Sequence, residues 1–144
     1  MTLTPADIAE IAGTYNKANI RIGSLGGHSA LDVCRGAKAE GFETVVVAER
    51  GREQTYTRHF KTRENRGCVD HVILVDKFAD IVKPEVQEQL RKLNVIFVHS
   101  RYFWVYCDYN DIELSFRVPI FCNRILVRKE ERDDLLDLLE EMKK

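Results

Sequence analysis

The stretch that decides the fold is "IRIGSLGGHSALDVCRGAKAEGFETVVVAE", residues 20–49. Ile20–Leu25 is short and mostly apolar and runs into a Gly-Gly pair, which predicts a strand followed by a turn. Ser29–Glu40 carries apolar residues at helical spacing, and Gly41 suits the C-terminal end of such a helix. Thr44–Glu49 is rich in β-branched residues, as is typical of a strand covered on both faces. Strand, helix and strand within about 30 residues predict a right-handed crossover unit.

The same alternation continues along the chain. "HVILVD" (71–76) is expected to be a third strand, and a helix is expected from Pro84 through Leu93 because proline is well tolerated at the first helical position. "VIFVH" (95–99) is expected to be a fourth strand, and "VPIF" (118–121) a shorter fifth. The predicted fold class is therefore α/β, a doubly wound, mainly parallel sheet of about five strands with a Rossmann-like arrangement.

Length and composition predict one main domain. The chain has 144 residues, of which 44% are hydrophobic, enough for a single ordinary core. We expect an α/β domain over residues 1–127 and a charged amphipathic helix over residues 128–144. The helix carries a narrow stripe of leucines: Leu135, Leu136, Leu138 and Leu139. It either docks on the domain or leads into a further part of a protein.

Charge and hydropathy limit the classes of partner that the protein is expected to bind. With 22 basic and 23 acidic residues the formal net charge is -1, which argues against a general electrostatic grip on nucleic acid or a membrane. No apolar run approaches the roughly 20 residues that span a bilayer, and the first residues are acidic where an export signal is basic. A cytoplasmic protein with a small-molecule or protein partner is expected.

The four cysteines lie far apart in the sequence. None forms a Cys-x-x-Cys pair, so no metal site is expected, and free thiols are the simplest interpretation. Cys34, Cys107 and Cys122 lie in apolar segments, where cysteine behaves as a small hydrophobe. The exposure of Cys68, in a polar stretch, is left open.

Residues 50–67, "RGREQTYTRHFKTRENRG", interrupt the α/β rhythm with many cations and two aromatic residues. Such a run is usually a solvated loop. Alternatively, it overhangs the carboxyl edge of the sheet and offers its cations to a phosphorylated ligand. Composition favours the solvated loop.

The turn after the first strand is the best candidate for a ligand site. In an open α/β sheet, ligands bind beyond the carboxyl ends of the strands, where backbone N–H groups of the first turn point at an anion. Gly26 and Gly27 permit positive φ and close approach of a phosphate. Ser29 could cap the helix, and His28 either donates to a ligand or is satisfied by the backbone. The pattern fits neither G-x-G-x-x-G nor a P-loop.

Two blocks of the sequence resemble a known family. "SLGGHSALDVCRGAKAEGFETVVV" (24–47) is similar to the L-G-S-H-S/T-x-L and G-A-K-x-E-G-F motifs of the PurP family, formate-dependent ligases of archaeal purine biosynthesis. "VIFVHSRYFWVYCDYNDIELSFRVPIFCNRILVRKEERD" (95–133) resembles that family's P-H-x-S-F, V-P-x-F-G-N-R and E-x-x-R-D segments. The resemblance extends from about Ile20 to Glu141, nearly the whole chain.

The resemblance implies a function. PurP enzymes formylate the aminoimidazole carboxamide ribonucleotide AICAR to FAICAR in IMP biosynthesis, using formate, ATP and Mg²⁺. They are ATP-grasp ligases in which a domain like this one comes first, and the ATP and metal sites follow it. By resemblance, His28 contacts the nucleotide substrate. The substrate-binding residues carried over are Gly26, Gly27, His28, Ser29, Ser100, Tyr102 and Arg124, with no catalytic residue in this chain.

The sequence departs from the family pattern at several of these positions. Gly27 replaces the usual serine of the first loop. Alignment on the following aromatic residues places Tyr102 at the substrate-binding serine and Ser100 at the histidine, or else Ser100 supplies the hydroxyl after a local shift. Cys122 replaces the glycine of G-N-R, while Arg124 is retained.

Three functions remain open at this point. In the first, the chain is the AICAR-binding N-terminal domain of such a ligase or a diverged stand-alone relative of it. This chain alone is expected to be inactive, because the ATP-grasp part would lie elsewhere in the protein or on a separate subunit. Alternatively it is a non-catalytic binding or regulatory module for a phosphorylated small molecule. A third possibility is a structural subunit, for which the leucine stripe suggests a homo-oligomer. No cofactor is expected to bind this chain alone.

Overall fold

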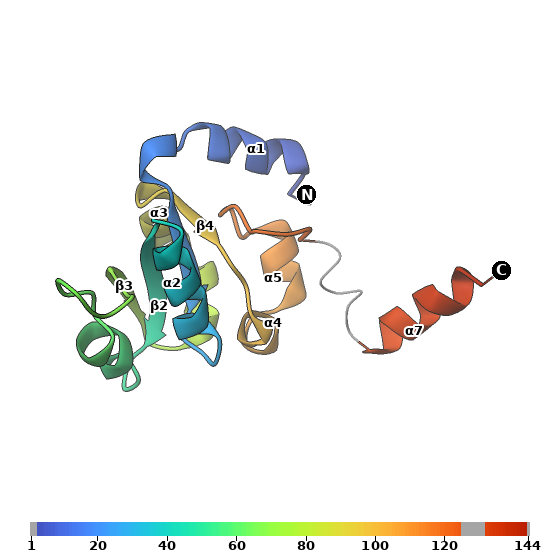
Figure 1. Ribbon diagram of the computed structural model, residues 1–144. Coiled ribbons are helices and arrows are strands. Elements are labelled where there is room, and N and C mark those ends of the chain that lie inside the picture. The colour runs from blue at the N-terminus through green and yellow to red at the C-terminus, as the bar shows by residue number, and fades with distance from the viewer. Residues whose placement is uncertain (1–2, 125–131, 144) are drawn as a thin grey trace.

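Four parallel strands form one sheet in the order β3-β2-β1-β4 (Figure 1). The computed structural model describes residues 3–124 and 132–143 of the chain. In that part the strands are β1 (Arg21–Leu25), β2 (Glu43–Glu49), β3 (His71–Val75) and β4 (Val95–Phe97). The parallel pairing and the crossovers confirm the doubly wound, Rossmann-like class expected from the sequence.

The segment "VPIF" does not form the expected fifth strand. Ile120 makes only an isolated parallel bridge with Phe97. The Phe97 N–H donates to the Pro119 carbonyl, and the Phe121 N–H donates back to the Phe97 carbonyl, both at 2.8 Å. Proline has no N–H to continue the ladder, and Cys122 turns the chain away with a φ of 134°. The sheet therefore has four strands.

Helices cover both faces of the sheet (Figure 1). The α-helices are α1 (Pro5–Gly13), α2 (Ala30–Ala39), α3 (Pro84–Lys92), α4 (Arg101–Tyr106), α5 (Tyr109–Leu114) and α7 (Arg132–Glu141). Shorter helical turns are η1 (Lys17–Asn19), the π-type η2 (Thr55–His59) and the 3-10 type η3 (Phe78–Val82). The sequence predicted α2 and α3 within one or two residues, and a C-terminal helix, but not α1, α4 or α5.

A capping box begins α1. The Thr4 hydroxyl accepts from the Asp7 N–H at 3.2 Å, and the Asp7 carboxylate accepts from the Thr4 N–H at 2.8 Å. Pro5 stands at the first helical turn. This Thr-Pro-x-Asp pattern is a helix-start signal that was readable in the sequence.

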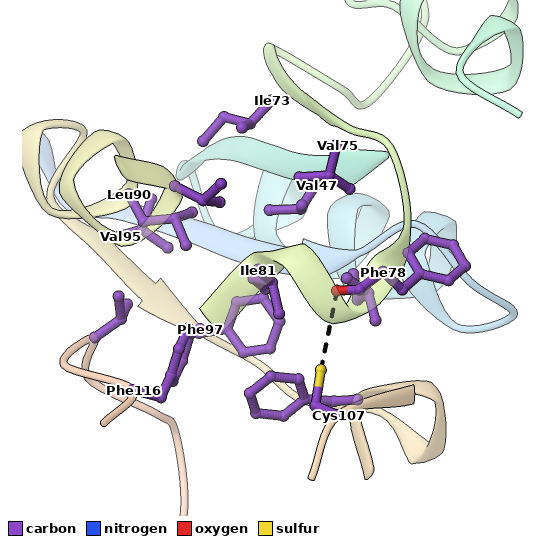
Figure 2. Packing of buried hydrophobic residues seen from close by; sticks show 14 of the residues in the cluster. Val47, Ile73, Val75, Phe78, Ile81, Leu90, Val95, Phe97, Cys107 and Phe116 are labelled. Carbon is purple, nitrogen blue, oxygen red and sulfur yellow. Dashed lines mark hydrogen bonds between the residues drawn. The ribbon is translucent and has the colours of Figure 1, made fainter. Parts of the chain in front are cut away.

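The core explains why β2 is an apolar run. Val45 and Val47 belong to the cluster on the face that α3 and η3 cover, whereas Val46 and Ala48 belong to the cluster on the α2 face. Successive strand residues point to opposite faces, so a strand buried on both needs no polar alternation. Figure 2 shows the larger cluster, in which the Cys107 thiol lies 3.9 Å from the Phe78 carbonyl oxygen.

The cysteines differ from one another. Among the described residues no disulfide is present; Cys34, Cys68 and Cys107 are buried, and Cys122 is exposed. The interpretation of Cys122 as a small hydrophobe of an apolar segment is therefore wrong. Its Sγ lies 3.0 Å from His99 Nε2 instead. Burial raises the pKa of Cys34 and of Cys107 to about 12, so both remain thiols at neutral pH.

Asp70 fixes the start of β2 against the start of β3. Its carboxylate accepts from the Thr44 N–H at 2.9 Å and from the Lys38 ammonium at 3.1 Å. The Thr44 hydroxyl donates to the Cys68 carbonyl at 2.6 Å and accepts from the Asp70 N–H at 3.1 Å. Burial alone would raise the pKa of Asp70, but these hydrogen bonds outweigh it and hold the pKa below its usual value.

We expect Asp70→Asn to lower the free energy of unfolding by about 1–3 kcal/mol, because hydrogen bonds to a charged group are lost. The wild-type carboxyl has a lower pKa folded than unfolded, so its contribution is fully present above about pH 4 and is lost as the pH falls through the folded pKa. Urea unfolding of wild type and Asp70→Asn at pH 7 and pH 3 measures this difference in the free energy of unfolding. The same change at Asp76, in an exposed ion pair with Arg50, should cost far less. Equal losses at both pH values would contradict the ionised role of Asp70.

The C-terminal helix is present as α7. Leu135, Leu136 and Leu139 are exposed along it, and Leu138 is half-buried. The expected boundary between residues 127 and 128 lies outside the described residues, and the division into two parts stays a prediction. No helix in the described part of the chain is both long and apolar enough to cross a bilayer.

Candidate functional site

The chain changes its direction of winding beside β1. From β1 it passes through α2 to β2 on one side, and after β3 it returns through α3 to β4 on the other side. In doubly wound sheets, ligands bind at the carboxyl ends of the strands where the order reverses. The loop after β1 and the segment after β4 flank that point, and together they hold six of the seven predicted site residues.

Aromatic rings explain the two glycines of the β1–α2 loop. A Cβ on Gly26 would lie 2.9 Å from the Tyr56 ring, and a Cβ on Gly27 would lie 2.7 Å from the Tyr102 ring. Neither glycine has positive φ; in the described chain the glycines in that region are Gly41, Gly51 and Gly67. Close approach of the rings, rather than a left-handed backbone, is therefore what requires glycine here.

Ser29 occupies the residue before α2 but does not cap it. Its side chain makes no capping hydrogen bond, and its backbone is helical, with φ -93° and ψ -1°. A capping serine normally has extended backbone, which aims its oxygen at the first amides. The expectation that Ser29 caps the helix is thus wrong. The first turn of α2 has no side-chain acceptor from this position, and amides at a helix start suit an anion.

His28 and Tyr102 meet across the switch point. Their rings are edge-to-face with centroids 5.3 Å apart. Tyr102, from α4, also contacts Phe78 at 6.1 Å and Tyr106 at 5.3 Å between centroids. His28 itself is exposed. The structure brings together the two residues that the sequence placed 74 positions apart in the proposed site.

Two serine hydroxyls near the switch point are buried without a partner. Ser100 Oγ, at the start of α4, has no hydrogen-bond partner in the described chain. The same holds for Ser24 Oγ, in β1, whose residue is fully buried. A buried hydroxyl without a partner is costly and is common where a ligand or water completes the site. Ser24 was not anticipated; its signal was a hydroxyl inside an otherwise apolar strand.

Tyr56 is a second residue that sequence reasoning missed. It lies in η2, and its hydroxyl is 3.5 Å from the Gly27 carbonyl oxygen, a long hydrogen bond. Burial, assisted by nearby Cys34 and Tyr102, raises its pKa, so the phenol stays protonated and can donate. The charge of Arg52 works against this rise of the pKa. Nothing in the sequence around Tyr56, an aromatic residue in a basic loop, indicated that it would contact Gly27.

Arg124 stands apart from the loop. Its Nη1 donates to the Ile112 carbonyl at 2.8 Å and to the Phe116 carbonyl, and its Nη2 donates to the Val118 carbonyl at 2.8 Å. The guanidinium is buried, which lowers its pKa to about 10, and it remains charged at neutral pH. It borders an apolar cavity of about 530 Å³ between α1 and residues 120–124. The structure gives Arg124 a structural role, and its substrate-binding role stays a prediction.

Comparison with known proteins assigns the chain to a protein family. A family model described as "Protein of unknown function (DUF1246)" matches residues 22–143. The chain belongs to this family. Curated relatives from Methanosphaera stadtmanae, Methanobrevibacter smithii and Methanocaldococcus jannaschii are each named 5-formaminoimidazole-4-carboxamide-1-(beta)-D-ribofuranosyl 5'-monophosphate synthetase. These names confirm the resemblance to PurP.

The relatives of this DUF1246 chain are longer than it is. They are 44%, 43% and 43% identical to it in the order given, over 88%, 94% and 90% of the chain. The same alignments cover 33%, 36% and 34% of the relatives. The chain thus spans about a third of the length of the curated relatives it matches.

All seven predicted site residues lie inside the DUF1246 match. Among the residues that the structure describes, no group of three or more His, Cys, Asp and Glu side chains could hold a metal ion. What the site offers is backbone amides, hydroxyls, an exposed imidazole and aromatic rings. Groups of this kind can hydrogen-bond to a phosphate and stack against a flat aromatic ring.

Proposed function

We propose that this chain is the AICAR-binding part of a formate-dependent ligase that makes FAICAR. The observation that carries the proposal is the meeting of His28 and Tyr102, with ring centroids 5.3 Å apart, at the start of α2 and at the switch point of the sheet. The names of the curated relatives supply the substrate. ATP and Mg²⁺ would be held by other parts of a complete ligase.

Each part of the ligand has a proposed partner in the site. The phosphate binds the amides of the first turn of α2, where the helix dipole favours an anion. His28 donates to the ligand from its exposed position beside the loop. The buried Ser100 hydroxyl accepts from or donates to the carboxamide, which satisfies an otherwise unpartnered group. Tyr102 offers an aromatic face to the imidazole ring.

Asp32 opposes this arrangement. It is exposed in the first turn of α2, where its negative charge competes with a phosphate for the same amides. Arg52, whose charge acts on the Tyr56 phenol, is the cation that we propose offsets the charge of Asp32. Arg50 is already paired with Asp76 at 2.8 Å.

Calorimetric titration with AICAR tests the proposal on this chain alone, without ATP. We expect wild-type protein to bind, and His28→Ala to bind about tenfold more weakly because one hydrogen bond to a charged or polar ligand group is lost. His71→Ala is the matched control, since His71 begins β3 at the opposite, amino end of the sheet and should leave affinity unchanged.

Absence of heat at millimolar AICAR would contradict the proposal, and so would equal affinity in His28→Ala. Ribose 5-phosphate distinguishes the second candidate, a regulatory module for phosphorylated small molecules. Binding of ribose 5-phosphate as tight as that of AICAR would favour the module, because the imidazole carboxamide would then contribute nothing. A cytoplasmic location and a homo-oligomer stay predictions.

A further inference from the structure

A group of basic side chains lies on the segment between β2 and β3. Five side chains surround a hollow of about 250 Å³: Arg58, His59, Lys61, Arg63 and Arg66. No carboxylate lines this hollow. Within the described chain, Arg58, Arg63 and Arg66 take part in none of the ion pairs. The positive charge is therefore concentrated at one place in a chain whose net charge is -1.

The backbone around the hollow is fixed mainly by main-chain hydrogen bonds, and the Lys61 ammonium donates to the Asp70 carbonyl. Arg63 and Arg66 form an antiparallel bridge, with reciprocal N–H to carbonyl hydrogen bonds of 2.8 and 2.7 Å. Gly67 follows with φ +84°, and a Cβ there would collide with the Lys61 carbonyl. The N–H groups of Cys68 and Val69 both donate to the Phe60 carbonyl, at 2.9 and 3.0 Å. The hairpin backbone thus brings Arg63 and Arg66 side by side at the hollow, with their side chains exposed.

Cations held together in this way repel one another. Like charges at close range disfavour the charged state, and arginine stays charged at any physiological pH. A bound anion removes this repulsion and gains charge-assisted hydrogen bonds from the planar guanidinium groups, which match phosphate oxygens. The solvated-loop interpretation of residues 50–67 agrees with the exposure of these side chains, but it does not account for their gathering around one hollow.

We propose that this hollow is a second anion site, which takes a small molecule carrying two linked phosphoryl groups. Its size points to a diphosphate rather than a whole nucleotide, because pockets for larger ligands usually exceed about 300 Å³. The ligand is either free pyrophosphate or the diphosphate group of a larger molecule whose remainder stays outside. The site differs from the β1–α2 loop in its residues, although η2 contributes Tyr56 to the loop and Arg58 to the hollow.

Titration with sodium pyrophosphate at low ionic strength tests this site. We expect wild-type protein to bind, and Arg63→Gln/Arg66→Gln to bind at least about tenfold more weakly, because two charge-assisted contacts are removed. The backbone bridge between these residues is retained in the variant. Lys17→Gln/Lys92→Gln removes the same charge from two exposed positions and should bind like wild type. Circular dichroism and thermal unfolding establish that each variant is folded.

Further titrations identify the ligand and distinguish this site from the proposed AICAR site. Inorganic phosphate should bind more weakly than pyrophosphate, and ADP should match pyrophosphate if the diphosphate of a larger molecule is the ligand. His28→Ala should leave pyrophosphate binding unchanged. No pyrophosphate binding to wild type, or equal binding to the double arginine variant, overturns the site. Loss of pyrophosphate binding in His28→Ala overturns its independence, and tighter binding of a single-stranded oligonucleotide overturns the small-molecule assignment.

Discussion

Replacing Arg124 with methionine should lower the free energy of unfolding by about 3–5 kcal/mol. The side chain retains its apolar stem, but the carbonyls of Ile112, Phe116 and Val118 lose their buried donor. A buried acceptor left without a partner costs about 1–3 kcal/mol, and three are affected here. The guanidinium also lies over the Phe116 ring, 5.8 Å from its centroid. Urea unfolding followed by circular dichroism measures the loss.

The same variant separates a structural from a ligand-binding role for Arg124. If the role is structural, folded Arg124→Met protein at low temperature binds AICAR with wild-type affinity. Arg117→Met is the control, because Arg117 is an exposed arginine of the same segment and should cost less than about 0.5 kcal/mol. A stability loss no larger than that of the control would show that the three carbonyl contacts contribute little. Unchanged stability with lost AICAR binding would establish the substrate role.

The second large effect concerns Gly27 and Tyr102 as a pair. Gly27→Ser in the wild-type background should destabilise the protein by about 1–3 kcal/mol, because the new Cβ would lie 2.7 Å from the Tyr102 ring. Tyr102→Ser removes that ring and opens space above the loop. The double variant, with serine at both positions as the PurP pattern has it, should therefore be more stable than the sum of the single changes predicts.

A double-mutant cycle measures this coupling. We expect an interaction free energy of at least about 1 kcal/mol in favour of the double variant. Gly36→Ser is the matched control for the serine, since nothing lies within 4 Å of a Cβ at Gly36, in α2. Additive effects of the two changes would mean that Gly27 and Tyr102 vary independently. AICAR titration of the double variant then reports whether the Tyr102 ring contributes to binding.

The spacing of apolar residues was sufficient to predict helices that bury one stripe and strands that are buried on both faces. β2 could be predicted because consecutive β-branched residues suit a strand with apolar cover on two sides, and α2 because its apolar residues recur on one face between a serine and Gly41. Neither prediction needed knowledge of distant parts of the chain. α1 could have been predicted from its capping box, had Thr4 and Asp7 been weighed.

The site could be predicted only in part, because its contacts are long-range. The loop of Gly26 to Ser29 follows from strand order and glycine content. The rings that cover it come from η2 and α4, and nothing in the local sequence shows that Tyr56 and Tyr102 converge there. The resemblance aligned Tyr102 with a binding position, yet only the fold shows why glycine accompanies it. The buried contacts of Arg124 were likewise invisible to a motif that names the arginine alone.

The single bridge between Phe97 and Ile120 gives the sheet two unlike edges. Unpaired backbone groups along an edge strand are a template for another strand. On the β4 side, Pro119 and the turn at Cys122 stop pairing after two hydrogen bonds, so that edge is closed to further strands. On the β3 side, the Lys61–Val69 bridge ends before the strand begins, no other strand of the described chain pairs with His71–Val75, and Leu74 is exposed there. Edge-to-edge association of the sheet, wherever it occurs, is therefore directed to β3.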